Sequence, residues 1–77
     1  MSIEHLVTMA NDIAAYFASE PDRKAAVAGV RDHIRKFWDP SMRQKIIAQL
    51  REHDGDGMSD LARAAIEELA QSTGARA

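Results

Sequence analysis

Apolar side chains recur every three or four residues along most of this chain, which is the spacing of one face of an α-helix. Four segments show the pattern, and they predict helices at about residues 3–18, 22–38, 40–52 and 60–71. The side chains expected to face inward are Ile3, Leu6, Ala10, Ile13 and Phe17, then Val27, Val30, Ile34 and Phe37, then Met42, Ile46 and Leu50, and finally Met58, Leu61, Ala65, Ile66 and Leu69. No β-type alternation and no internal repeat is present. The sequence therefore predicts an all-α fold, a small bundle of three to four helices.

The ends of these segments carry residues that commonly cap or start helices. The expected N-terminal residues are Ser2 for the first helix, Ser19 or Glu20 with Pro21 for the second, Asp39 with Pro40 for the third, and Ser59 for the fourth. Residues 53–57 hold two glycines and two aspartates, which predicts a flexible connector. Residues 72–77 are expected to form a frayed tail.

Gly29 lies inside the second predicted helix, where glycine costs about 1 kcal/mol relative to alanine. A glycine in such a position usually marks the close approach of another element. We therefore expect the first helix to cross the second near Gly29.

The length of 77 residues fits a single helical domain over residues 1–77. Hydrophobic residues make up 45% of the chain, but 14 of them are alanines, which bury little area each. The core is therefore expected to be minimal, which favours completion of the fold by a partner. The absence of cysteine excludes disulfides, iron–sulfur ligation and thiolate zinc sites, and it fits a cytoplasmic location.

Neither a membrane span nor an export signal is expected. The longest uncharged stretch, Ile13–Ser19, is too short to cross a bilayer. Residues 1–4 lack the basic side chains of a secretory signal.

Charge is distributed unevenly, although the net charge is only −2. Residues 1–22 carry −4, residues 23–51 carry +6 and residues 52–77 carry −4. A basic centre between acidic ends indicates either ion pairing within the bundle or a patch for an acidic partner.

The connector carries part of a calcium-loop pattern. Glu52, Asp54, Asp56 and Asp60 occupy ligand positions, but Arg63 stands where such loops need a bidentate glutamate. A cation at that position repels the metal, so the pattern predicts an ordinary turn.

The three histidines, His5, His33 and His53, lie on different predicted elements and lack the spacing of zinc ligands. The serines lie at helix ends, where capping explains them. No phosphate-binding glycine loop or nucleotide motif is present. The sequence predicts no catalytic, cofactor-binding or metal-binding residue in this chain.

Residues 32–43 form the densest segment, with the only tryptophan, one of the two phenylalanines and several basic groups. This composition is typical of interface hot spots. Phe37 and Trp38 either plug the end of the bundle or contact a partner, and both hold if one ring points inward and the other outward.

The alternative function for the basic centre is that of a free helical binding module, such as a small nucleic-acid-binding regulator. The side chains that would face phosphates are Arg31, Arg35, Lys36, Arg43 and Lys45. The acidic ends of the chain and the lack of a turn glycine near Asp39 argue against nucleic acid.

Leu6–Phe17 and Ala26–Arg43 carry a resemblance to a known family, with a weaker match at Leu61–Ala65. The chain resembles the delta subunit of NAD-dependent formate dehydrogenase, the cytoplasmic molybdenum- or tungsten-containing type. The most specific part runs from His33 to Pro40 and on to Met42 and Arg43. Tyr16 stands where the family often has phenylalanine.

The resemblance implies a non-catalytic accessory subunit that supports the assembly, stability or cofactor retention of a large catalytic subunit. In such a complex the partner subunits carry the molybdenum or tungsten pterin, iron–sulfur clusters, FMN and NAD. This chain is expected to bind none of them. Without its partner, exposed apolar surface would favour a homodimer.

The resemblance also implies candidate positions for the partner interface. They are Met9, Asn11, His33, Phe37, Trp38, Pro40, Met42 and Arg43. Asparagine is a poor helix former, so we expect Asn11 to form a side-chain hydrogen bond, inside the bundle or to the partner. The first turn of a helix disfavours a cation, so we expect a carboxylate, internal or across an interface, to compensate Arg43.

Overall fold

The computed structural model describes residues 2–74, with side chains as far as Ser72, and this part of the chain contains four helices and no strand. The helices are α1 (Ile3–Phe17), α2 (Arg23–Phe37), α3 (Pro40–His53) and α4 (Asp60–Gly74). The predicted all-α bundle is confirmed. No helix among these four has the length and apolar character needed to cross a bilayer.

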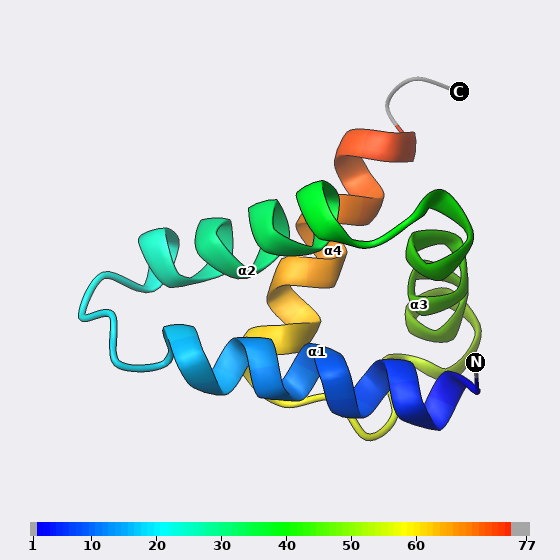
Figure 1. Cartoon of the computed structure of the whole chain (residues 1–77), viewed down its shortest axis with the longest axis horizontal. Helices are drawn as coiled ribbons and strands as arrows, with labels where there is room; N and C mark the ends of the chain where they lie inside the picture. Colours follow the sequence, from blue (N-terminus) through cyan, green and yellow to red (C-terminus); the bar gives the residue numbers. More distant parts are fainter. Residues whose placement is uncertain (1, 75–77) are drawn as a thin grey trace.

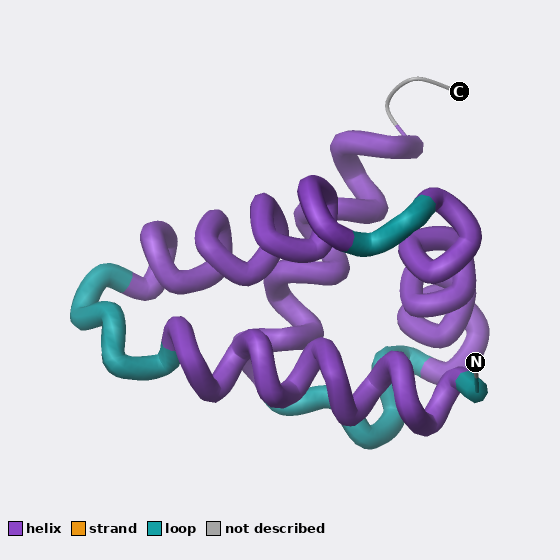
Figure 2. The backbone as a smooth tube through the Cα atoms, in the orientation of Figure 1, coloured by secondary structure: helices purple, strands orange, loops and turns teal. Residues whose placement is uncertain are grey.

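Helices α1 and α2 run antiparallel and are joined by a short loop at residues 18–22 (Figure 1). Helix α3 stands at the far end of this pair, with its axis steeply inclined to both (Figure 2). Helix α4 crosses behind α1 and α2, and it contacts all three other helices. The last helix therefore closes the face that the first two leave open.

One hydrophobic cluster joins the four helices. Its largest fully buried side chains are Leu6, Val30, Ile34, Ile46, Ile66 and Leu69. Alanines occupy the positions between them, namely Ala10, Ala14, Ala62, Ala65 and Ala70. Short side chains let the helices approach closely, but each adds little buried area, so this core depends on accurate placement of its helices.

The predicted inward faces differ from the structure mainly at the helix ends. Phe37 is 71% exposed, whereas Trp38 beside it is only 5% exposed. Helix α2 ends at Phe37, and the extended backbone of Trp38 (φ −88°, ψ 141°) turns its ring inward. Six other predicted core residues are only half-buried against the cluster, namely Ile3, Ile13, Phe17, Met42, Leu50 and Leu61.

Three predicted N-caps are confirmed. The Ser2 hydroxyl accepts from the N–H of His5 at 3.2 Å. The Asp39 carboxylate accepts from the N–H of Met42 at 3.0 Å, with Pro40 as the first helical residue. The Ser59 hydroxyl accepts from the backbone N–H of Ala62 at 3.2 Å.

The second helix begins about where predicted, but its predicted capping residues are wrong. Asp22 is its N-cap, and the Asp22 carboxylate accepts from the N–H of Lys24 at 3.0 Å. The Glu20 carboxylate instead accepts from the N–H of Asp22 at 3.2 Å, and Pro21 lies before the helix. Aspartate is the stronger capping residue because its short side chain reaches the first free amides of the helix.

The predicted tail is also wrong in part, because α4 continues through residues 72–74. Ser72 accepts a hydrogen bond from Arg35 of α2 at 3.0 Å, which ties the last turn of α4 to its neighbour. Residues 75–77 lie outside the described part of the chain.

The predicted crossing at Gly29 is confirmed. A methyl group added at Gly29 would lie 2.5 Å and 2.6 Å from Cε1 and Cδ1 of the Phe17 ring. Such distances are far below van der Waals contact, so the ring of Phe17 occupies the space that any larger residue would need. Glycine at this position therefore allows α1 and α2 to pack closely.

We predict that Gly29→Ala lowers the free energy of unfolding by about 1 kcal/mol, because overpacking against Phe17 outweighs the better helix propensity of alanine. In a Phe17→Ala background the same change should stabilise the protein by about 1 kcal/mol, because only the propensity remains. Urea unfolding of the wild type, the two single variants and the double variant tests this prediction. Stabilisation by Gly29→Ala in the presence of Phe17 would contradict the close crossing.

Candidate partner interface

The side chain of Asn11 bridges α1 to the loop before α4. Its Nδ2 donates to the carbonyl of Gly57 at 2.9 Å, and its Oδ1 accepts from the N–H of Ser59 at 2.8 Å. The carboxamide thus pairs with one backbone acceptor and one backbone donor of the same loop. The predicted hydrogen bonding of Asn11 is confirmed, and its partners lie within the chain.

The loop itself forms consecutive turns, as its glycines and aspartates predict. Asp54, Gly55 and Gly57 have φ values of 56°, 70° and 86°. Gly55 is buried, and its carbonyl accepts from the N–H of Met58 at 2.9 Å. The glycines supply left-handed backbone that other residues adopt at a cost. The turns place Met58 in the core and Ser59 at the start of α4.

Arg43 closes the corner between α2 and α3. Its Nη1 donates to the carbonyls of Arg35 at 2.9 Å and Trp38 at 2.8 Å. The last carbonyls of a helix lack partners within the helix and carry partial negative charge, so a guanidinium is well placed there. Within the described chain the hydrogen bonds of Arg43 go to the C-terminal end of α2 and not to a carboxylate, although the charge of Arg43 helps to lower the pKa of Asp39. A carboxylate across an interface stays a prediction.

Asp39 supports the same corner from the start of α3. The N–H of Met42 and the hydroxyl of Ser41 both donate to its carboxylate, and they lower the pKa of Asp39 below its usual value. The cap therefore stays ionised into more acidic solution than an isolated aspartate would. Pro40 is exposed at the first position of α3, and Met42 is half-buried.

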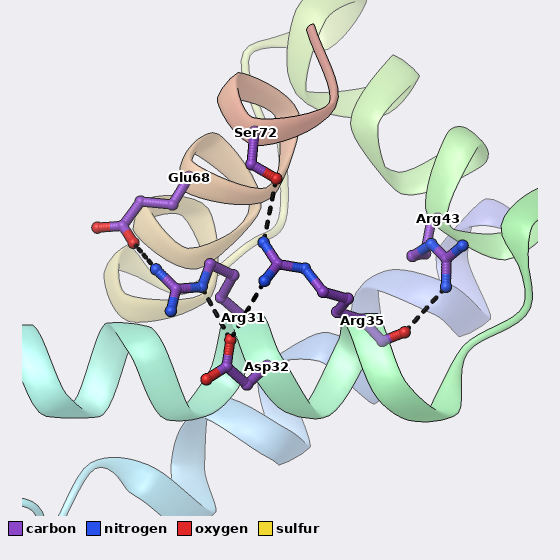
Figure 3. A network of polar contacts seen from close by, with 6 residues as sticks. All are labelled: Arg31, Asp32, Arg35, Arg43, Glu68 and Ser72. Carbon is purple, nitrogen blue, oxygen red and sulfur yellow. Dashed lines mark hydrogen bonds and ion pairs between the residues drawn. The ribbon is translucent and has the colours of Figure 1, made fainter. Parts of the chain in front are cut away.

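A polar network links α2 to α4 (Figure 3). Arg31 donates to Glu68 at 2.7 Å and to Asp32 at 3.0 Å, and Arg35 lies 3.7 Å from Asp32. The hydrogen bond from Arg31 lowers the pKa of Asp32. Exposed pairs of this kind each add little stability. These ion pairs show that part of the basic centre, residues 23–51, pairs with acidic side chains within the bundle. This agrees with the interpretation of the uneven charge as ion pairing within the fold.

Two pairs of ring side chains lie on α1 and α2, Tyr16 with Phe17 and His33 with Phe37, and we call the four together the aromatic surface. The ring of Tyr16 meets that of Phe17 edge-on, with centroids 5.1 Å apart, and the rings of His33 and Phe37 are 4.8 Å apart. Tyr16, Phe17 and His33 line one groove. Tyr16 is 79% exposed and Phe37 is 71% exposed, so the two outer rings face solvent.

The structure therefore divides the candidate interface residues. Asn11, Trp38 and Arg43 make contacts within the chain, while Met9 and Met42 pack half-buried against the core. Only His33 and Phe37 belong to the aromatic surface. The interface role of all eight stays a prediction.

Tyr16 was not among the predicted interface residues, although the sequence contained a signal for it. It lies outside the stripe formed by Leu6, Ala10, Ile13 and Phe17. A tyrosine on the polar side of an amphipathic helix lacks a core position to fill, so it is a candidate for contact with another molecule.

The histidines remain apart in the fold, with His5 on α1, His33 on α2 and His53 on α3. Among the side chains that the structure describes, no group of three or more histidine or acidic residues is placed to hold a metal ion.

Comparison with known proteins identifies the family of the chain. A family model described as "NADH-dependant formate dehydrogenase delta subunit FdsD" matches residues 5–66. The matched range includes Asn11, the corner at Trp38 and Arg43, and the aromatic surface. No curated protein and no solved structure matches the chain significantly.

We predict that Asn11→Leu lowers the free energy of unfolding by about 2 kcal/mol, because it leaves a donor and an acceptor of the loop without partners. The loss should occur although leucine is the better helix former. The matched control is Gln44→Leu at an exposed amide on α3, which should change stability by less than about 0.5 kcal/mol. Faster amide exchange at Ser59 in the Asn11 variant alone would confirm the bridge, and equal stability of both variants would contradict it.

We predict that Arg43→Met costs about 2 kcal/mol of stability, because two carbonyls at the end of α2 lose a charged donor. Arg43→Lys should lose less, since the charge remains near the helix end while the guanidinium geometry is lost. Lys45→Met, an exposed change in the same helix, serves as the control and should be nearly neutral. Chemical unfolding measures all three, and a neutral Arg43→Met would show that the corner does not depend on this contact.

Proposed function

Since the chain belongs to the family of NADH-dependent formate dehydrogenase delta subunits, we propose that it is a non-catalytic accessory subunit that docks onto the large catalytic subunit of such an enzyme. A delta subunit of a multi-subunit formate dehydrogenase has partner subunits. The proposal concerns which partner it binds, by which surface, and what the binding achieves.

The observation that carries the proposal is the aromatic surface. Tyr16 and Phe37 expose most of their area, at 79% and 71%, in a chain whose core relies on alanine. Aromatic side chains are enriched at protein interfaces and often supply most of the binding energy there. Burying these two rings against a partner would remove the largest exposed hydrophobic side chains of the described chain from water.

The polar residues support the same conclusion through what they do in the fold. Asn11 holds the loop before α4, Arg43 caps α2, and Arg31 links α2 to α4. These side chains form hydrogen bonds to other parts of the same chain, which is expected of a subunit with a structural role. We propose that the chain binds no cofactor and that the molybdenum or tungsten pterin, iron–sulfur clusters, FMN and NAD belong to the partner subunits. The chain then supports the assembly, stability or cofactor retention of the catalytic subunit in a cytoplasmic complex.

The alternative of a nucleic-acid-binding module gains no support from these contacts. Three of the five basic side chains that it requires, Arg31, Arg35 and Arg43, make hydrogen bonds within the chain. The remaining two, Lys36 and Lys45, are exposed on different helices.

Co-purification from the native host tests the proposal. A tagged chain should recover the catalytic subunit in equal amounts, and the double variant Tyr16→Ala/Phe37→Ala should reduce that recovery roughly tenfold or more because hot-spot rings are lost. The variant should remain folded, since both rings are exposed. The control is Gln44→Ala/Lys45→Ala on α3.

Two outcomes would count against the proposal. Recovery of nucleic acid without any formate dehydrogenase subunit would favour the alternative function. Unchanged recovery by the aromatic double variant, with loss in the α3 control, would place the interface on another face. Formate-dependent NAD reduction by complexes assembled with and without the chain then separates a role in assembly from a role in catalysis.

A further inference from the structure

The groove of the aromatic surface contains one formal charge. Its lining residues are Asp12, Ile13, Tyr16, Phe17 and His33. Asp12 is exposed, and within the described part of the chain its carboxylate makes no ion pair or hydrogen bond. The Asp12 carboxylate thus lies in a groove whose other lining residues are apolar or aromatic, apart from the polar imidazole of His33.

Several other acidic side chains are used within the fold. Asp22 and Asp39 cap helices, Asp32 and Glu68 pair with Arg31, and Asp60 pairs with Arg23 at 2.8 Å. Asp12 has no such role, although it lies one residue after Asn11, whose side chain is fully engaged. The negative charge of Asp12 is therefore available to a molecule that enters the groove.

Building on the proposed function, we propose that this groove receives an arginine side chain from the catalytic subunit. A guanidinium ion pairs with a carboxylate through its edge and stacks on aromatic rings through its face. The groove presents Asp12 for the edge and Tyr16 with Phe17 for the face. Lysine matches the charge and can lie over a ring, but it has no planar group that pairs with a carboxylate through two N–H groups and stacks on a ring at the same time, so arginine fits the groove better.

Charge complementarity favours a cationic partner segment over a second copy of this chain. A second copy would bring its own Asp12 toward the same surface in a symmetric dimer, and like charges at an interface are unfavourable. A basic segment of the catalytic subunit instead pairs with Asp12 while its apolar neighbours cover the exposed rings of Tyr16 and Phe37.

The first test compares Asp12→Asn with Glu67→Gln in binding to the purified catalytic subunit. Both remove one negative charge from an exposed acid, the first in the groove and the second on α4. Asp12→Asn should weaken the dissociation constant roughly tenfold at low salt, and the difference from wild type should shrink as salt rises. Glu67→Gln should bind like wild type. Equal affinities for wild type and Asp12→Asn at low salt would overturn the proposal.

The second test identifies the occupant. A photoreactive benzoylphenylalanine placed at Tyr16 in the complex should cross-link to a catalytic-subunit peptide that contains an arginine. Replacing that arginine with alanine should weaken binding of the wild-type chain more than binding of the Asp12→Asn chain, because the ion pair is already absent from the variant while the stacking is lost from both.

Cross-linking to a second copy of the chain, or to an acidic or uncharged peptide, would overturn the inference while wild-type co-purification still upholds the accessory role. Failure of the wild-type chain to bind any formate dehydrogenase subunit would instead remove the proposed function itself. The two failures are therefore distinguishable.

Discussion

The position of α4 depends on the two hydrogen bonds of the Asn11 carboxamide. They tie the loop of residues 54–59 to the middle of α1, and this loop delivers Met58 to the core and Ser59 to the N-cap of α4. Helix α4 supplies the alanines and large apolar residues that close the bundle. Since an alanine-rich core gains little from each contact, it tolerates little misplacement of its helices. A directional polar contact therefore supplies precision that the hydrophobic effect alone does not.

Arg43 provides the second such contact, at the corner between α2 and α3. The chain leaves α2 at Phe37, turns the ring of Trp38 inward, and begins α3 behind the cap of Asp39. The guanidinium of Arg43 holds the carbonyls that this turn leaves without partners. The inward turn at Trp38 leaves Phe37 on the outside, next to His33. The corner thus stabilises the fold and also completes the aromatic surface.

Local features of the chain could be predicted from the sequence, because they depend on neighbours a few residues apart. The helices and the caps at Ser2, Asp39 and Ser59 belong to this group. The close crossing at Gly29 is a tertiary contact, but a glycine inside a helix indicated it. Asp22 caps α2 in place of the predicted Ser19 or Glu20, because it is the residue directly before the first helical residue, Arg23. The family resemblance, carried by the segments around Asn11 and His33–Arg43, is confirmed by the match over residues 5–66.

Tertiary features could not be predicted in the same way. The partners of Asn11 lie 46 and 48 residues away, and nothing in its own helix indicates them. The inward ring at the corner could not be identified, because helical periodicity ends where α2 ends and both Phe37 and Trp38 fit a core position. Within the described chain, Arg43 donates to backbone carbonyls instead of a carboxylate, since the end of a helix also offers negative charge. Composition of the loop predicted turns correctly but not the hydrogen bonds that order them.

The central claim is that the corner at Trp38 stabilises the fold, whereas the aromatic surface binds the partner. Hydroxyl-radical footprinting of the isolated chain and of its complex with formate dehydrogenase tests it most directly, because oxidation of each ring reports its exposure. We predict that Tyr16 and Phe37 are oxidised in the free chain and protected in the complex, whereas Trp38 is protected in both. Oxidation of Tyr16 and Phe37 at the same rate in the complex, with protection arising on another face, would contradict the account.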